Sequence, residues 1–145
     1  MGRSTYSFTD LSGAFAHPAL GAYVFTGQGV GQVIVHMATE KTSHDVAADG
    51  TVMISKIAGD NGQITVECQQ TSDVHKFLLA WFNYVKFAPT EEWAQAACTL
   101  RNTSDGTSHI CTGISPQNVP DKTYAAQGGR VSWVLMCGDI QSLTA

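Results

Sequence analysis

Three glycines at alternate positions are the first candidates for chemistry, because a glycine-rich loop can hold a phosphate group. Gly27, Gly29 and Gly31 stand in the segment FTGQGVGQVIV. A dinucleotide-binding loop must follow a strand and open a helix. Here the β-branched residues of VIVHM come next and alternate with period two, which indicates a strand. The glycines are therefore predicted to make a turn or bulge at the entrance to a sheet, and no cofactor is predicted.

The cysteines raise the possibility of a zinc site. Cys98, His109 and Cys111 are the nearest approach to a ligand set, but their spacing matches no common zinc pattern and no fourth ligand is apparent. Cys68 and Cys137 lie on the apolar faces of predicted strands, so both are expected to be small, reduced core residues. No metal site is predicted.

Neighbouring polar residues do not suggest a catalytic set. His44 and Asp45 are adjacent, as are Ser108 and His109, so their side chains point apart in an extended chain. No GxSxG motif is present. Because no nucleophile, base and orienting group come together, the chain is not expected to be an enzyme.

Charge and composition narrow the function further. Twelve Asp and Glu residues outnumber eight Lys and Arg, so a basic surface for gripping nucleic acid is missing. Charged residues make up only 14% of the chain, which favours a subunit whose faces are covered by copies of itself. No segment resembles a signal peptide or a membrane span, so a soluble protein is expected. Residues 1–145 are expected to form one domain.

Alternating hydrophobic residues predict a mostly β fold. The predicted strands are 5–17, 32–37, 51–58, 63–70, 97–102, 108–114 and 130–138. A turn at 59–62 is predicted to join 51–58 and 63–70 into a hairpin, and Asp49-Gly50 is predicted to turn into the first of these strands. The last strand is apolar on both faces and is therefore predicted to be covered on both sides.

One segment, residues 73–86, has helical rather than strand periodicity. Its large apolar residues recur at steps of three and four and form one stripe. Ser72 is suited to cap the start of the helix, and Pro89 discourages its continuation. We expect this helix to clamp the sheet, with its stripe in the core.

With the strands placed, residues 37–83 resemble the tail tube proteins of bacteriophages with long contractile tails. The segments 5–15 and 120–135 are similar to that family's first strand and closing segment, whereas residues 16–30 and 97–111 match nothing in its pattern. The resemblance rests on short motifs in the right order, namely Met37, Glu40 and Lys41; Ala48, Asp49, Gly50 and Met53; Gly59 and Gly62; Thr65 and Val66; and Thr71, Ser72 and Asp73.

The resemblance implies a β-sandwich or partly rolled antiparallel sheet with a flanking helix at about residues 73–86. It implies a structural virion protein whose hexameric rings stack into a tube for DNA ejection. A sheath protein would surround the tube, a tape measure protein and then DNA would occupy its lumen without specific binding, and baseplate and tail terminator proteins would lie at its ends. It implies assembly in the host bacterial cytoplasm, with no cofactor and no membrane contact.

Under this resemblance, the polar segment 38–50 is expected to reach a neighbouring subunit or ring. The expected contact residues are Met37, Glu40, Lys41, His44 and Asp45. A mobile surface loop is the alternative for this segment. For the whole chain, the alternatives are the tube of a phage-derived bacteriocin or secretion machine, a small ligand-binding β-barrel module with an apolar cavity, and an enzyme with an unrecognised site.

Overall fold

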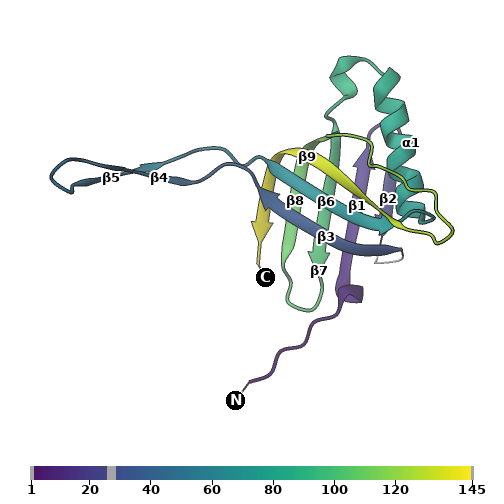
Figure 1. Ribbon diagram of the computed structural model, residues 1–145, viewed down its shortest axis with the longest axis horizontal. Helices are drawn as coiled ribbons and strands as arrows, with labels where there is room; N and C mark the ends of the chain where they lie inside the picture. Colours follow the sequence, from purple (N-terminus) through teal and green to yellow (C-terminus); the bar gives the residue numbers. More distant parts are fainter. Residues whose placement is uncertain (1, 26–28, 145) are drawn as a thin grey trace.

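The computed structural model describes residues 2–25 and 29–144. Its body is a curled, antiparallel seven-stranded sheet in the order β2-β1-β7-β8-β9-β6-β3, with one helix, α1 (Asp73–Phe87), at its side (Figure 1). The strands are β1 (Leu11–His17), β2 (Gly21–Phe25), β3 (Val30–Met37), β6 (Gly62–Gln69), β7 (Ala96–Asn102), β8 (Ser108–Pro116) and β9 (Arg130–Leu143). The predicted fold class, a rolled antiparallel sheet with a flanking helix, is confirmed.

The core lies between α1 and the inner face of the sheet, the face that is turned toward the helix. Trp81 of α1 and Trp133 of β9 are both fully buried, and Trp81 meets the ring of Phe15 edge-on at 4.9 Å between centroids. Trp133 Nε1 donates a 3.0 Å hydrogen bond to Nδ1 of the buried His75. Burial lowers the pKa of His75, which favours the neutral ring that this bond requires.

The helix begins and ends almost where the sequence predicts. Ser72 Oγ accepts a hydrogen bond from the backbone N–H of His75 at 3.3 Å, which caps the first turn. The predicted apolar stripe faces the sheet, although Phe77 and Phe82 are only partly buried. The chain leaves the helix at Ala88, next to Pro89.

The glycines at the start of β3 form a bulge and a left-handed turn residue, as the sequence predicts for Gly29 and Gly31. A bulge in the pairing of β3 with β6 falls between Val30 and Gln32, at Gly31. Gly29 has φ of +71°, and a Cβ there would lie 2.6 Å from Cβ of Ser72. Gly29 therefore combines a left-handed conformation with close approach to the helix cap. Gly27 lies outside the described residues.

The predicted hairpin between residues 51–58 and 63–70 is wrong. β5 (Val52–Lys56) pairs with β4 (Thr42–Val46) in a separate two-stranded sheet, whereas β6 pairs with β3 and β9. Residues 59–62 make no tight turn because their backbone bonds to the body. The Asp60 carbonyl accepts from Ile140 N at 2.7 Å and the Asn61 carbonyl from Ala38 N at 3.0 Å.

Two strand predictions need smaller corrections. The predicted strand 5–17 starts only at Leu11, because Phe8–Asp10 forms a 3-10 turn and Tyr6 is exposed. β9 is covered on one face only. Trp133 and its inward-facing neighbours are buried, but Met136 on the outer face is exposed within the single chain.

The helix contact predicts a clear difference between two positions of α1. Leu78→Ala removes a side chain that is 3% exposed, and we expect the free energy of unfolding to fall by about 2–5 kcal/mol. Phe87→Ala, at a position 83% exposed, is the matched control and should change it by less than about 0.5 kcal/mol. Urea unfolding followed by circular dichroism measures both. Equal losses at the two positions would contradict this account of the core.

Candidate functional site

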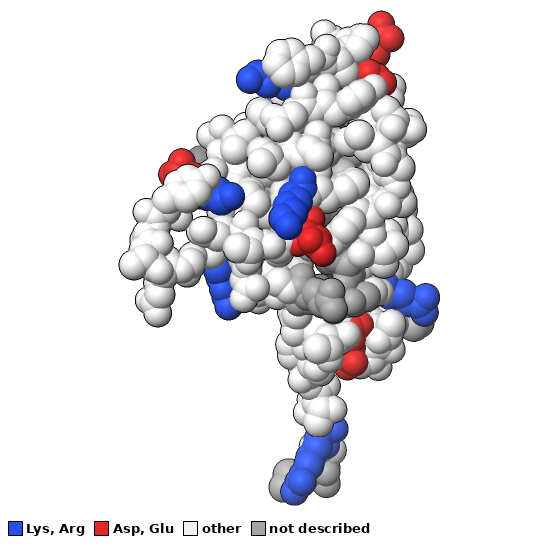
Figure 2. Space-filling view, turned by 90° about the vertical axis from the view of Figure 1, so that its right-hand side faces the viewer, with Lys and Arg blue, Asp and Glu red and all other residues white. Residues whose placement is uncertain are grey.

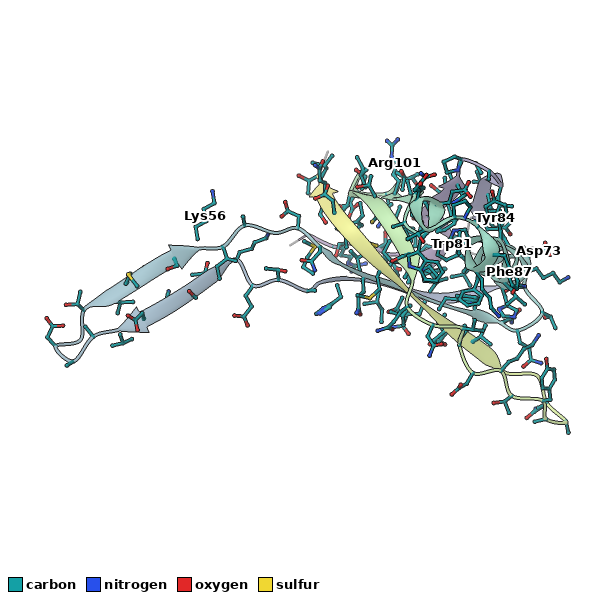
Figure 3. The ribbon with its side chains drawn as sticks, turned by 90° about the horizontal axis from the view of Figure 1, so that it is seen from above. Lys56, Asp73, Trp81, Tyr84, Phe87 and Arg101 are labelled. Carbon is teal, nitrogen blue, oxygen red and sulfur yellow. The ribbon has the colours of Figure 1, made fainter. Side chains whose placement is uncertain are left out.

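Several exposed apolar side chains lie on the hairpin of β4 and β5, residues 42–56, which we call the arm. The arm projects well away from the body (Figures 1 and 3). All residues of β4 are exposed, and in β5 only Ser55 is partly covered. The arm is thus held by its own pairing rather than by packing on the sheet.

The register of the arm separates it into two unlike faces. Val46 pairs with Val52 and His44 with Ile54, so the three apolar residues share one face. Their exposed fractions are 64% for Val46, 46% for Val52 and 67% for Ile54. The opposite face carries Ser43, Asp45, Met53 and Ser55.

The apolar face of this amphipathic hairpin would be stabilised by burial against a partner. A two-stranded hairpin is at best marginally stable alone, and it usually needs its apolar face covered. Burying a branched aliphatic side chain contributes about 1.5–3 kcal/mol, so covering three of them would contribute several kcal/mol. The body of the same chain leaves them uncovered.

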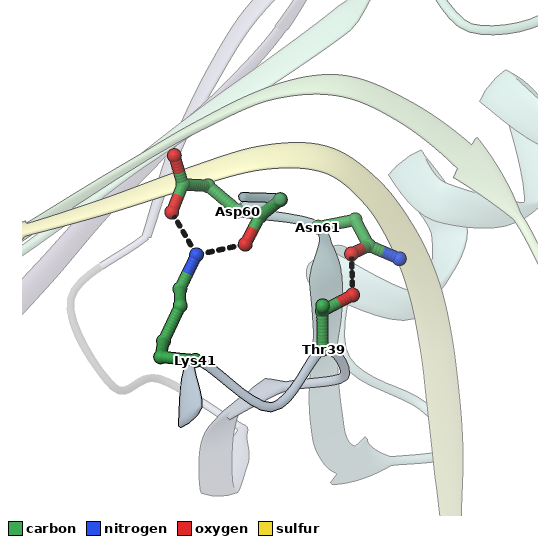
Figure 4. A network of polar contacts seen from close by, with 5 residues as sticks. Thr39, Lys41, Asp60 and Asn61 are labelled. Atoms are coloured by element: carbon green, nitrogen blue, oxygen red, sulfur yellow. Dashed lines mark hydrogen bonds and ion pairs between the residues drawn. The ribbon is translucent and has the colours of Figure 1, made fainter. Parts of the chain in front are cut away.

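Polar contacts define both ends of the arm. At the tip, Thr51 N donates to Asp49 Oδ1 at 3.0 Å, which lowers the pKa of that carboxyl group, and Gly50 has φ of +89°. The predicted turn at Asp49-Gly50 is confirmed. Residues 38–41 and 57–61 join the arm to the body, and we call them the neck. There, Lys41 Nζ lies 2.5 Å from Asp60 Oδ1 and also donates to the Gly59 carbonyl (Figure 4).

A second neck contact joins Thr39 Oγ1 to Asn61 Oδ1 at 2.5 Å (Figure 4). The backbone N–H of Ile57 donates to the Lys41 carbonyl at 2.9 Å. Exposed ion pairs such as Lys41–Asp60 contribute only about 0–1 kcal/mol. These contacts therefore fix where the arm leaves the body more than they stabilise the fold.

The interior of the body offers little room for a ligand. The cavity between α1 and the sheet, beside Phe15 and Leu78, measures about 10 Å³. Small-molecule sites usually measure about 300–1,000 Å³. A hollow β-barrel that encloses a ligand is therefore not what this core forms.

Comparison with known families identifies the chain. The family model described as "Bacteriophage PhiTE tail tube protein" matches residues 3–144. The chain belongs to the PhiTE tail tube protein family. It is a structural protein, a tail tube subunit, as the sequence motifs predict. Comparison with curated protein sequences gives no significant match.

Solved structures of injection machines share the fold of this tail tube subunit. A chain of the anti-feeding prophage baseplate, 6-fold symmetrised, has a TM-score of 0.70 at 12% identity, covering 99% of this chain and 97% of its own. A chain of the sheath/tube terminator of the PVC extracellular contractile injection system has a TM-score of 0.65 at 8% identity, covering 97% of this chain and 98% of its own. A chain of the sheath-tube complex of that system has a TM-score of 0.60 at 9% identity, covering 97% of this chain and 93% of its own.

The predicted contact residues of the tail tube subunit follow one continuous projection. Met37 ends β3, Glu40 and Lys41 lie in the neck, and His44 and Asp45 lie on opposite faces of the arm. They do not form one cluster, and Lys41 is bound within its own chain. Sequence reasoning missed the exposed apolar residues of the arm, Val46, Val52, Met53 and Ile54. A usable signal was present, because branched residues flank the Asp49-Gly50 turn.

The cysteines of the subunit belong to the core, and no zinc site is found among the described residues. Cys98 and Cys111 lie opposite each other on β7 and β8, and all four thiols are buried. His109 instead bonds Ser142 on β9, with 2.7 Å between Nδ1 and Oγ. Within residues 2–25 and 29–144, no helix is long and apolar enough to cross a membrane.

Burial predicts that these thiols are unreactive in the folded subunit. Burial raises the pKa of Cys68, and it raises that of Cys98 to about 12. The Cys111 pKa is also raised, by its hydrogen bond with Cys137 and by burial, whereas the same bond lowers the pKa of Cys137. Cys137 is only 4% exposed, so a reagent cannot reach it in the folded chain. At pH 8 a thiol-reactive disulfide dye should therefore react with none of the four in native protein and with all four in denaturant. Rapid reaction of a native thiol would contradict this placement.

Proposed function

We propose that this tail tube subunit assembles into stacked hexameric rings that form the DNA ejection channel of a contractile tail. The observation that carries the proposal is the arm, whose apolar face the chain's own body leaves uncovered. The shared fold with chains of contractile injection systems adds support. Residues 1–145 act as one structural domain, and the subunit has no enzymatic role.

The two edges of the sheet supply the surfaces for ring formation. Among the described residues, β2 and β3 each pair with only one neighbouring strand, so each offers unpaired backbone groups on its free side. Exposed edge strands pair readily with another chain. Copies joined edge to edge would continue the sheet around a channel.

The outer face of the sheet suits a channel for DNA. The outward residues of β6 are Gln63, Thr65 and Glu67, and Glu67 is paired with Arg130 at 3.1 Å. A hydrated lining with little net positive charge would let DNA pass without the counterion release that drives binding. The tape measure protein would occupy this lumen first.

The opposite side of the body is suited to protein partners. Figure 2 shows charged side chains of both signs scattered over the side of the molecule that carries α1, with uncharged residues between them. We assign the sheath protein to the outside of the tube, and baseplate and tail terminator proteins to its two ends. Assembly would take place in the host bacterial cytoplasm. Met37, Glu40, Lys41, His44 and Asp45 would lie at or near the contact with the next copy.

A phage-derived injection machine is the second candidate. The fold neighbours include chains from the anti-feeding prophage and the PVC contractile injection system. The subunit would form the same kind of tube in both settings. Purified particles that contain DNA would favour a phage tail, and particles without a DNA-filled head would favour the injection machine.

Electron microscopy of the concentrated, purified protein tests the assembly directly. We expect six-fold rings, or hollow tubes with a regular axial repeat, in negative stain. An initiating baseplate complex should be added if the subunit alone remains monomeric. Monomers that persist at high concentration with that complex present would overturn the proposed function.

The arm makes a sharper prediction. Val46→Ser combined with Ile54→Ser removes apolar groups that are exposed in the monomer, so the free energy of unfolding should change by less than about 0.5 kcal/mol per site. Tube formation should nevertheless be lost, because the buried contact between copies is weakened. Thermal unfolding and electron microscopy measure the two effects.

Met53→Ser is the matched control, since Met53 is 60% exposed on the opposite face of the same arm. It should form tubes as the unmodified protein does. Tubes of normal length from the double variant would show that the apolar face of the arm is not an assembly surface.

A further inference from the structure

We propose that the apolar face of the arm docks into a groove at the open end of the curled sheet of a second copy. This inference rests on the proposed function and identifies the acceptor site for the arm. The groove is lined by Phe8, Leu11, Val33, Val35 and Leu100, which come from the first turn and from β1, β3 and β7. It lies beside β3, a free edge of the sheet.

The volume of the groove matches that of the exposed apolar side chains of the arm. Its volume is about 340 Å³. A cavity of about 150 Å³ already holds a benzene molecule. The groove therefore has room for about two branched aliphatic side chains, such as Ile54 with Val46 or Val52.

The polar groups around the two surfaces are complementary. Lys56 shares the face of the arm that carries Ile54. Asp105 and Thr107 lie on the rim of the groove. Thr107 N donates to Asp105 Oδ1 at 2.9 Å, which keeps that carboxylate charged and in place. A cationic arm base would therefore meet an anionic rim, whereas the carboxylate of Asp45 points from the opposite face of the arm.

The occupant of the groove is the arm of a second copy, because each arm points away from the groove of its own chain. The arm extends out from the body (Figures 1 and 3). Its apolar residues Val46, Val52 and Ile54 are 46% to 67% exposed in the single chain. Donor and acceptor are different surfaces of one chain, so the contact is head-to-tail. Such contacts repeat without limit unless they close into a ring, as growth of a tube requires.

Disulfide trapping between copies tests the docking. One preparation carries Ile54→Cys on the arm, and the other carries Thr107→Cys on the groove rim. The two are mixed, assembled into tubes and oxidised with a mild copper oxidant. In an equal, randomly mixed assembly each arm meets the other variant in about half of its contacts, so up to about half of the protein should run as a cross-linked dimer on a non-reducing gel. The four native cysteines are at most 4% exposed and should not compete.

Two matched variants fix the specificity. Met53→Cys lies on the opposite face of the arm, and Thr99→Cys lies on the outer face of β7, away from the groove. Ile54→Cys with Thr99→Cys, and Met53→Cys with Thr107→Cys, should each give only background product. Product from either pair that equals the arm–groove pair would overturn the docking.

The outcomes separate this inference from the proposed function. If tubes form but the Ile54–Thr107 product is absent, the groove is not the acceptor, and the tube function stands. If neither tubes nor product form with an initiating complex present, both proposals fail. If the product and tubes appear together, the arm occupies the groove in the assembly.

Discussion

The packing of α1 against the inner face of the sheet is the contact on which the rest of the molecule depends. Trp81 from the helix and Trp133 from β9 are both 0% exposed, and they leave almost no empty space between the two layers. The hydrogen bond from Trp133 to His75 also fixes the position of the helix along the sheet. Gly29 lets the start of β3 pass close to the Ser72 cap. The curl of the sheet and the start of the helix are thus determined together.

Because the core is tightly packed, the features available for binding lie on the surface. The cavity between α1 and the sheet measures only about 10 Å³, and all four cysteines are buried in the core. What remains is a free arm, two strand edges and an open groove beside β3. All of these surfaces are open to other chains, as the proposed assembly of a tail tube family member requires.

Local patterns in the sequence predicted the helix, most body strands and the family, but not the partner of each strand. The stripe of α1 is decided within fifteen residues, so periodicity alone predicts it. Residues 51–58 alternate in the same way whether they pair with 63–70 or with 42–46. That choice depends on Asp60 and Asn61, whose carbonyls bond to Ile140 and Ala38 and so prevent a tight turn. The first of these contacts lies some eighty residues away and leaves no local signal.

The same limit explains why the arm was only partly predicted. The family resemblance predicts that segment 38–50 reaches a neighbour, with His44 and Asp45 among the expected contact residues. The groups that most need cover are Val46, Val52 and Ile54, which a sequence pattern assigns to a core because branched residues usually lie there. Exposed apolar groups on a free hairpin normally favour aggregation. The opposite face of the arm carries Met53 as its one apolar residue, so the proposed docking would direct self-association to the face with three branched residues. An apolar face that favours aggregation in a monomer would therefore be a specific contact in the tube that we propose.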